Sequence, residues 1–221
     1  TSLGSDPRSG GSGASGVSSP REALLLVDVR RTHTFAKLVV ATVLFVLGTL
    51  VIIPADATAR WVHAVGILPT LVCAGWLSIV LRDESRYRPW MSVVFAGASG
   101  LGIASTFFFW GVFSSGVVVV PIVLYFFAQG GSTAPVAAAA LGSVVPHAVL
   151  GLLVTTGVVE DRGVIRPVGL GALEATVVLG IAQFIFGIAF FLARAHRRST
   201  EEGMEKLEQA VASGDILRVP G

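Results

Sequence analysis

Long apolar runs separated by short polar segments fill the middle of the chain. A hydrocarbon core of about 30 Å is crossed by about 20 helical residues at a rise of 1.5 Å per residue, so runs of this length predict transmembrane helices. Six runs fit this description, at 35–53, 61–81, 90–112, 116–131, 134–158 and 170–193. Since they lack the ten-residue alternation of a membrane β-barrel, the pattern predicts an all-α polytopic helical bundle of six transmembrane helices.

The run at 116–131 fits a full crossing least well. It is short and contains Pro121, which cannot donate a backbone hydrogen bond inside a helix. A tilted, kinked or partly re-entrant segment is the alternative for this run, and five crossings is then the alternative to six. Ser114, Ser115 and Gly116 predict a tight turn just before it.

The two segments before the first run differ in composition. Residues 1–20 are rich in Ser and Gly and predict a disordered tail, because they offer too few large apolar side chains to bury. Residues 21–34 mix leucines and valines with arginines in an apolar stretch too short to span a bilayer. They predict a juxtamembrane segment, with an interfacial helix and a plain linker as the two alternatives.

Helical spacing continues after the last run, over residues 194–213. Arg197 and Glu201 are four positions apart, and Met204, Leu207 and Val211 form an apolar stripe. An amphipathic connector on the cytoplasmic side is predicted, either pairing as a coiled-coil homodimer or lying alone against the membrane or the next domain. Residues 214–221 are expected to be a linker toward a missing domain, which would make the chain a fragment.

Basic residues gather on one side of the predicted bundle. With six crossings, ten arginines and lysines flank the helices on the side that carries both ends, and three lie on the other side. The first group is Arg21, Arg30, Arg31, Lys37, Arg82, Arg86, Arg88, Arg194, Arg197 and Arg198, and the second is Arg60, Arg162 and Arg166. By the positive-inside rule, both termini are expected in the cytoplasm of a cell with the chain in its inner membrane.

The composition agrees with a membrane protein. Hydrophobic residues make up 53% of the 221 residues and charged residues only 14%, and the mean hydropathy is +0.78. About a quarter of the residues are charged in an ordinary water-soluble domain. The formal net charge of +2 resides in the ends and loops, which favours anionic lipid headgroups rather than nucleic acid as the partner.

No catalytic, metal-binding or cofactor-binding motif is found in the sequence. The single cysteine, Cys73, cannot form a disulfide within the chain. Gly97, Gly100 and Gly102 superficially resemble a nucleotide-binding loop, but they lie inside an apolar run where close helix packing is the expected role. No cofactor is therefore expected, and whether the chain belongs to an enzyme stays open.

Four polar residues fall within the predicted spans, where each costs free energy in lipid. They are His63, His147, Glu174 and Gln183. One hypothesis joins them in an intramembrane polar cluster that binds a cation, a proton or a small ligand. The alternatives are interhelical hydrogen bonds that only secure packing and, for Glu174, a carboxylate that reaches water at the interface.

Three strings, GVFSSGVVVVPIVLYFFAQ, PHAVLGLLVTTGVVED and FFLARAHRRSTEEGMEKLEQAV, resemble a known type of membrane region. It is the multi-helix region found before the catalytic domain in some bacterial serine/threonine protein kinases, especially those of myxobacteria. The resemblance covers roughly residues 21–221. It implies a cytoplasmic kinase domain as the partner, but the kinase glycine loop, lysine and catalytic aspartate have no counterpart in this chain.

These observations predict a membrane anchor and sensor module of a bacterial signalling protein. The sixth helix would transmit a shift or rotation through the connector, whose expected signal-transmitting residues are Arg194, Arg197, Arg198, Met204, Leu207 and Val211. A small transporter or channel subunit is the first alternative, motivated by His147 and Gln183 at similar depth. A passive membrane scaffold is the second.

Overall fold

The computed structural model describes the backbone of residues 20–166 and 169–213, and their side chains except for 20–23, 207, 208 and 210–212. The expected tail before residue 20 and the linker at 214–221 lie outside the described residues.

All regular structure in the described part of the chain is helical. The α-helices are α1 (Pro20–Ile52), α2 (Ala57–Val80), α3 (Pro89–Trp110), α4 (Val119–Ala128), α5 (Ala134–Thr155) and α6 (Ala172–Ala212), with short 3-10 helices η1 (Glu84–Arg86) and η2 (Ser115–Val118). Five of the described helices are long and apolar enough to cross a membrane. The predicted all-α membrane bundle is thus confirmed.

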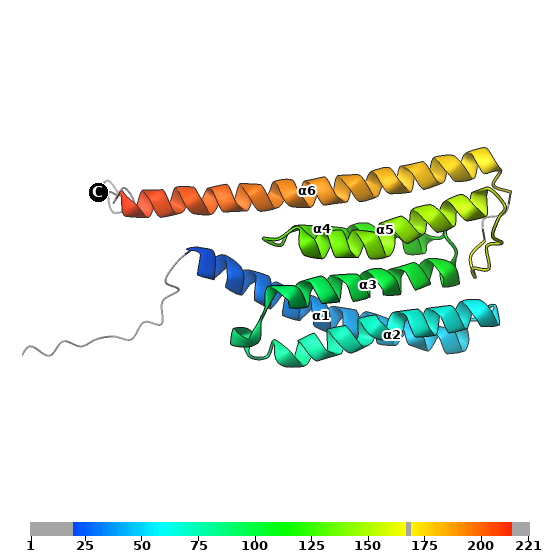
Figure 1. Ribbon diagram of the computed structural model, residues 1–221, viewed down its shortest axis with the longest axis horizontal. Coiled ribbons are helices and arrows are strands. Elements are labelled where there is room, and N and C mark those ends of the chain that lie inside the picture. Colours follow the sequence, from blue (N-terminus) through cyan, green and yellow to red (C-terminus); the bar gives the residue numbers. More distant parts are fainter. Residues whose placement is uncertain (1–19, 167–168, 214–221) are drawn as a thin grey trace, which may run out of the picture.

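The helices run back and forth along one common axis (Figure 1). As a result, the Pro20 end of α1 and the Ala212 end of α6 lie at the same end of the bundle, the left end in this view. We call it the connector end, and the other the far end. Residues 21–34 form the first part of α1 without a break, and residues 194–212 likewise continue α6.

The fourth pass is built differently from the other five. Helix α4 has 10 residues and covers only about 15 Å, half of a hydrocarbon core. Before it lies an irregular segment in which Gly111, Val112 and Ser114 are buried. Such backbone is tolerated at membrane depth because it is covered by protein.

The irregular segment begins where a glycine ends α3. Gly111 has a φ of 102°, a conformation that side chains other than glycine rarely adopt. The loop between α5 and α6 then covers this helix end: the Val164 and Ile165 N–H groups donate to the carbonyls of Phe109 and Trp110, at 2.8 and 2.9 Å. Carbonyls at a helix end that would otherwise lack partners are satisfied in this way.

Glycines bring the central helices into close contact. A Cβ atom built on Gly100 in α3 would lie 2.8 Å from the Cα of Gly142 in α5, and one built on Gly102 would clash with the Thr70 hydroxyl of α2. The expected packing role is confirmed for these two glycines. No neighbouring atom lies within 4 Å of a Cβ built on Gly97, so this glycine makes no close contact of this kind.

Helix α6 is much longer than a bilayer requires. Its 41 residues span about 60 Å, twice the thickness of the hydrocarbon core. The C-terminal part of α6 extends past the neighbouring helices at the connector end (Figure 1). It is therefore one unbroken helix that leaves the bundle next to the beginning of α1.

Candidate functional site: charged residues at the connector end

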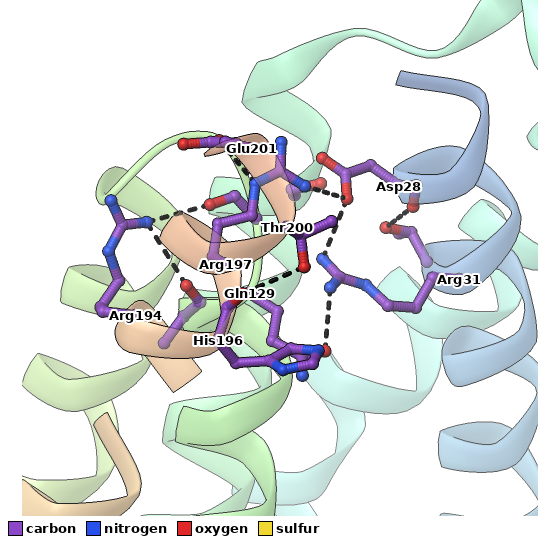
Figure 2. Close-up of polar contacts among 12 residues, drawn as sticks. Asp28, Arg31, Gln129, Arg194, His196, Arg197, Thr200 and Glu201 are labelled. Atoms are coloured by element: carbon purple, nitrogen blue, oxygen red, sulfur yellow. Dashed lines mark hydrogen bonds and ion pairs between the residues drawn. The ribbon is translucent and has the colours of Figure 1, made fainter. Parts of the chain in front are cut away.

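Charged and amide side chains from three elements meet at the connector end of the bundle (Figure 2). We call this group the clamp. It consists of Asp28 and Arg31 from α1, Gln129 from the α4–α5 turn, and Arg194, Arg197 and Glu201 from α6.

Arg197 is the centre of the clamp and is only 9% exposed. Its Nη1 lies 3.3 Å from Asp28 Oδ1, and its Nε donates to Glu201 Oε1 at 2.7 Å. The Asp28 side chain is itself 15% exposed, so this ion pair is largely removed from water. A buried guanidinium is tolerated only when it is paired, and here the pairing joins the first helix to the last.

Arg31 ties the same carboxylate to the α4–α5 turn. Its Nη2 lies 3.4 Å from Asp28 Oδ1, and its Nη1 donates to Gln129 Oε1 at 3.1 Å. The guanidinium also lies over the ring of Phe126, 5.0 Å from the centroid, in a cation–π contact. Asp28 is therefore shared between two arginines, one on its own helix and one on α6.

Arg194 holds the end of α4. Its Nη1 donates to the backbone carbonyls of Ala128 and Gly130, at 3.3 and 3.0 Å. A positive charge at this place is favourable because the C-terminal end of a helix carries a partial negative charge. Through Arg194 and Arg197, α6 is thus attached to both α4 and α1 near the point where it leaves the bundle.

The clamp has an excess of positive charge. Arg31, Arg194 and Arg197 face the two carboxylates of Asp28 and Glu201. An excess of cationic groups at a membrane surface attracts anionic lipid headgroups. The clamp therefore has the charge expected of a group at the bilayer surface.

A second polar network lies inside the bundle and joins α6, α5 and the irregular segment. Gln183 Nε2 is 2.9 Å from His147 Nδ1, and His147 Nε2 is 3.1 Å from the carbonyl oxygen of Val112. A carbonyl can only accept, so these partners assign the ring proton to Nε2, with Nδ1 accepting from the glutamine amide. Both ring nitrogens of this buried histidine are therefore satisfied within the protein.

Of the four polar residues expected to cluster, the structure brings together His147 and Gln183. His63 is fully buried elsewhere: its Nδ1 lies 2.9 Å from Ser105 Oγ, and its ring stacks on Phe109. Glu174 is exposed in the first turn of α6, where its charge suits the positive end of the helix. The four residues therefore do not form one cluster: His147 pairs with Gln183, His63 pairs with Ser105, and the Glu174 carboxylate is exposed.

The connector residues proposed from the sequence also divide into groups. Arg194 and Arg197 belong to the clamp, Arg198 is exposed and Met204 is partly buried. The side chains of Leu207 and Val211 are outside the described part of the structure. Sequence reasoning missed Asp28, Arg31 and Gln129 as clamp residues, although an aspartate within the apolar string LLLVDV could have indicated a buried charge.

No group of three or more His, Cys, Asp or Glu residues in the described part of the chain is arranged to hold a metal ion. Compared with known proteins, the chain matches no protein-family model, no curated protein and no solved structure. The class that the fold defines is a polytopic helical membrane protein. Its distinctive features are the clamp between the first and last helices and the long continuation of the last helix.

Proposed function

We propose that this chain is the membrane anchor and signal-transmitting module of a bacterial signalling protein. The observation that supports this function best is the continuity of α6, which passes from the far end of the bundle to beyond the connector end as one helix. A rotation or shift of such a helix in the membrane moves everything attached to its end. A passive anchor needs no helix of this length.

The contacts of α6 are suited to such a role. At the connector end the clamp attaches it to α1 and α4, and inside the bundle Gln183 attaches it, through His147, to the irregular segment before α4. A conformational change that breaks or re-forms either set would change the position of α6 relative to its neighbours. A signalling equilibrium requires two discrete arrangements of this kind, one with the contacts of α6 formed and one with them broken.

The resemblance of the sequence to kinase-associated membrane regions suggests the output domain. We propose that a serine/threonine kinase domain acts on the cytoplasmic side, with both ends of this chain in the cytoplasm and the bundle in the inner membrane. The excess of basic residues on the connector side supports this orientation. Reporter tags fused to the two ends of the chain should both be accessible only from the cytoplasm.

Insertions in α6 just after the clamp test signal transmission. One alanine inserted after Glu202 leaves the Arg197 and Glu201 contacts in place but turns the rest of the helix by about 100°. Seven inserted residues turn it by about 700°, only about 20° from the original direction, and so provide a matched control. The readout is the kinase activity of the complete protein that contains this chain, in proteoliposomes.

If α6 transmits a signal by its orientation, the single insertion changes kinase activity and the seven-residue insertion largely restores it. Equal activity of both variants and the unaltered protein would instead indicate a passive scaffold. A complete protein without a kinase domain would refute the proposed output. Transport receives less support from the structure, because both ring nitrogens of His147 are already occupied by protein partners.

A further inference from the structure

An apolar cavity of about 520 Å³ lies among α1, α2, α3 and the η2–α4 segment. Near the connector end it is closed where α1 meets α4, since the ring of Phe35 stacks on Phe126 with centroids 3.8 Å apart. Farther along, exposed side chains flank the cavity: Leu38 and Thr42 on α1, and Ile122 on α4. The cavity therefore opens sideways between α1 and α4, toward the bilayer.

The inner wall of the cavity carries hydroxyl groups, and none of the described residues that line it is charged. The hydroxyls of Thr70 and Thr106 donate to backbone carbonyls, at 2.7 and 2.9 Å. Ser99 differs: it is 4% exposed, lines the same cavity, and its Oγ has no hydrogen-bond partner within the described structure. A buried hydroxyl without a partner is unfavourable, and a ligand that offers an acceptor oxygen would remove that cost.

The depth of Ser99 restricts the chemistry of such a ligand. Ser99 is in the middle of α3, about 15 Å along the helix from Pro89 and about 16 Å from Trp110. It therefore lies near the centre of a hydrocarbon core about 30 Å thick. Phospholipid headgroups and ester carbonyls are at the edges of this core, so the acyl tails that reach this depth carry no acceptor. A neutral, lipid-soluble carbonyl compound can reach this depth and does carry an acceptor oxygen.

We propose that this cavity is a binding site for a neutral, lipid-soluble carbonyl compound of the quinone class. The compound enters from the bilayer between α1 and α4, and the Ser99 hydroxyl donates a hydrogen bond to its carbonyl oxygen. The volume is in the usual range of small-molecule sites. The site does not depend on the signalling function proposed above.

Fluorescence of the cavity tryptophan tests the proposal. A variant of the full 221-residue chain that keeps only Trp110 is reconstituted in lipid nanodiscs and titrated with a short-chain ubiquinone analogue. We expect saturable quenching. A variant that keeps only Trp90, which does not line the cavity, should show no saturable component and thereby control for collisional quenching in the lipid.

Single substitutions in the Trp110-only background test the role of the hydroxyl. Ser99→Ala should weaken quinone binding about three- to tenfold, the loss expected for one hydrogen bond. Ser143→Ala is the matched control, because Ser143 is a buried serine outside the cavity whose Oγ donates to the Ala139 carbonyl; it should leave the affinity unchanged. Thr42→Phe narrows the opening of the cavity between α1 and α4 and should lower the affinity for the quinone.

The absence of saturable quenching would overturn the proposal. So would equally tight binding of an alkylbenzene of similar size that lacks carbonyls, since the cavity would then be a groove for lipid tails. This comparison of the two probes uses the Ser99-containing protein and remains decisive if Ser99→Ala fails to fold.

Discussion

Replacing Arg197 by methionine probes the clamp most directly. Methionine keeps much of the aliphatic stem but removes the guanidinium, which pairs with Asp28 at 3.3 Å and with Glu201 at 2.7 Å. Removing one partner of a fully buried ion pair costs about 3–5 kcal/mol when the other charge is left unpaired. Asp28 keeps Arg31 at 3.4 Å, so we expect a smaller loss in the free energy of unfolding, about 2 kcal/mol.

A double-mutant cycle separates the Asp28–Arg197 contact from other effects of the two substitutions. Asp28→Asn and Arg197→Met, made singly and together, should show a coupling energy of at least about 1 kcal/mol in unfolding titrations with dodecyl sulfate in mixed micelles. Because both side chains are at most 15% exposed, added salt should change this coupling little.

Arg198→Met is the matched control for the arginine substitution. Arg198 is the next residue along α6 but is exposed, so its replacement should change the free energy of unfolding by less than about 0.5 kcal/mol. Equal losses for the Arg197 and Arg198 variants, or a coupling energy near zero, would refute the reasoning that the clamp joins α1 to α6.

Two further predictions concern helix contacts and helix caps. Gly100→Leu should lower the thermal midpoint of the purified protein by several degrees, because α5 lies 2.8 Å from a Cβ at this position. Gly97→Leu is the control and should leave the midpoint unchanged, because a Cβ at Gly97 meets open space. Similar midpoints for the two variants would contradict the close packing at Gly100. Asp56 caps α2 by accepting from the N–H groups of Ala59 and Thr58, and these hydrogen bonds, that from Ala59 above all, lower the pKa of its carboxyl group. The contribution of this cap to stability is therefore present above the ordinary carboxyl pKa and is lost as the pH falls through the lower pKa of the folded state. Asp56→Ala should remove this part of the loss of stability in acid. A pH profile of the thermal midpoint that is unchanged in this variant would contradict the role of Asp56 as a cap.

The helices could be predicted because hydrocarbon imposes one demand on every spanning segment. Backbone groups in lipid must be paired within the segment, so the length of an apolar run nearly determines the element. The predicted run 134–158 thus corresponds to α5, Ala134–Thr155. The short fourth pass was also indicated, since Pro121 and the turn residues before it set it apart from the other runs.

The polar contacts could be predicted only in part. Hydropathy gives the depth of a residue along its helix, and the similar depths of His147 and Gln183 correspond to their hydrogen bond. It does not give the rotation of each helix about its axis, and for this reason His63 could be grouped with them although it contacts Ser105. The pairing of Asp28 with Arg197 depends on which helices are neighbours, and a single hydropathy profile does not contain that information.

The pairing of Asp28 with Arg197 also has a consequence for biosynthesis. The two residues are 169 positions apart, so α1 reaches the membrane long before its partner arginine is translated. During that interval Arg31, one turn away on α1, is the cation available to neutralise the aspartate. The contact with Arg197 then forms only when the last helix arrives, which makes it a late step of assembly. Nascent chains that stop before this residue would lack it altogether.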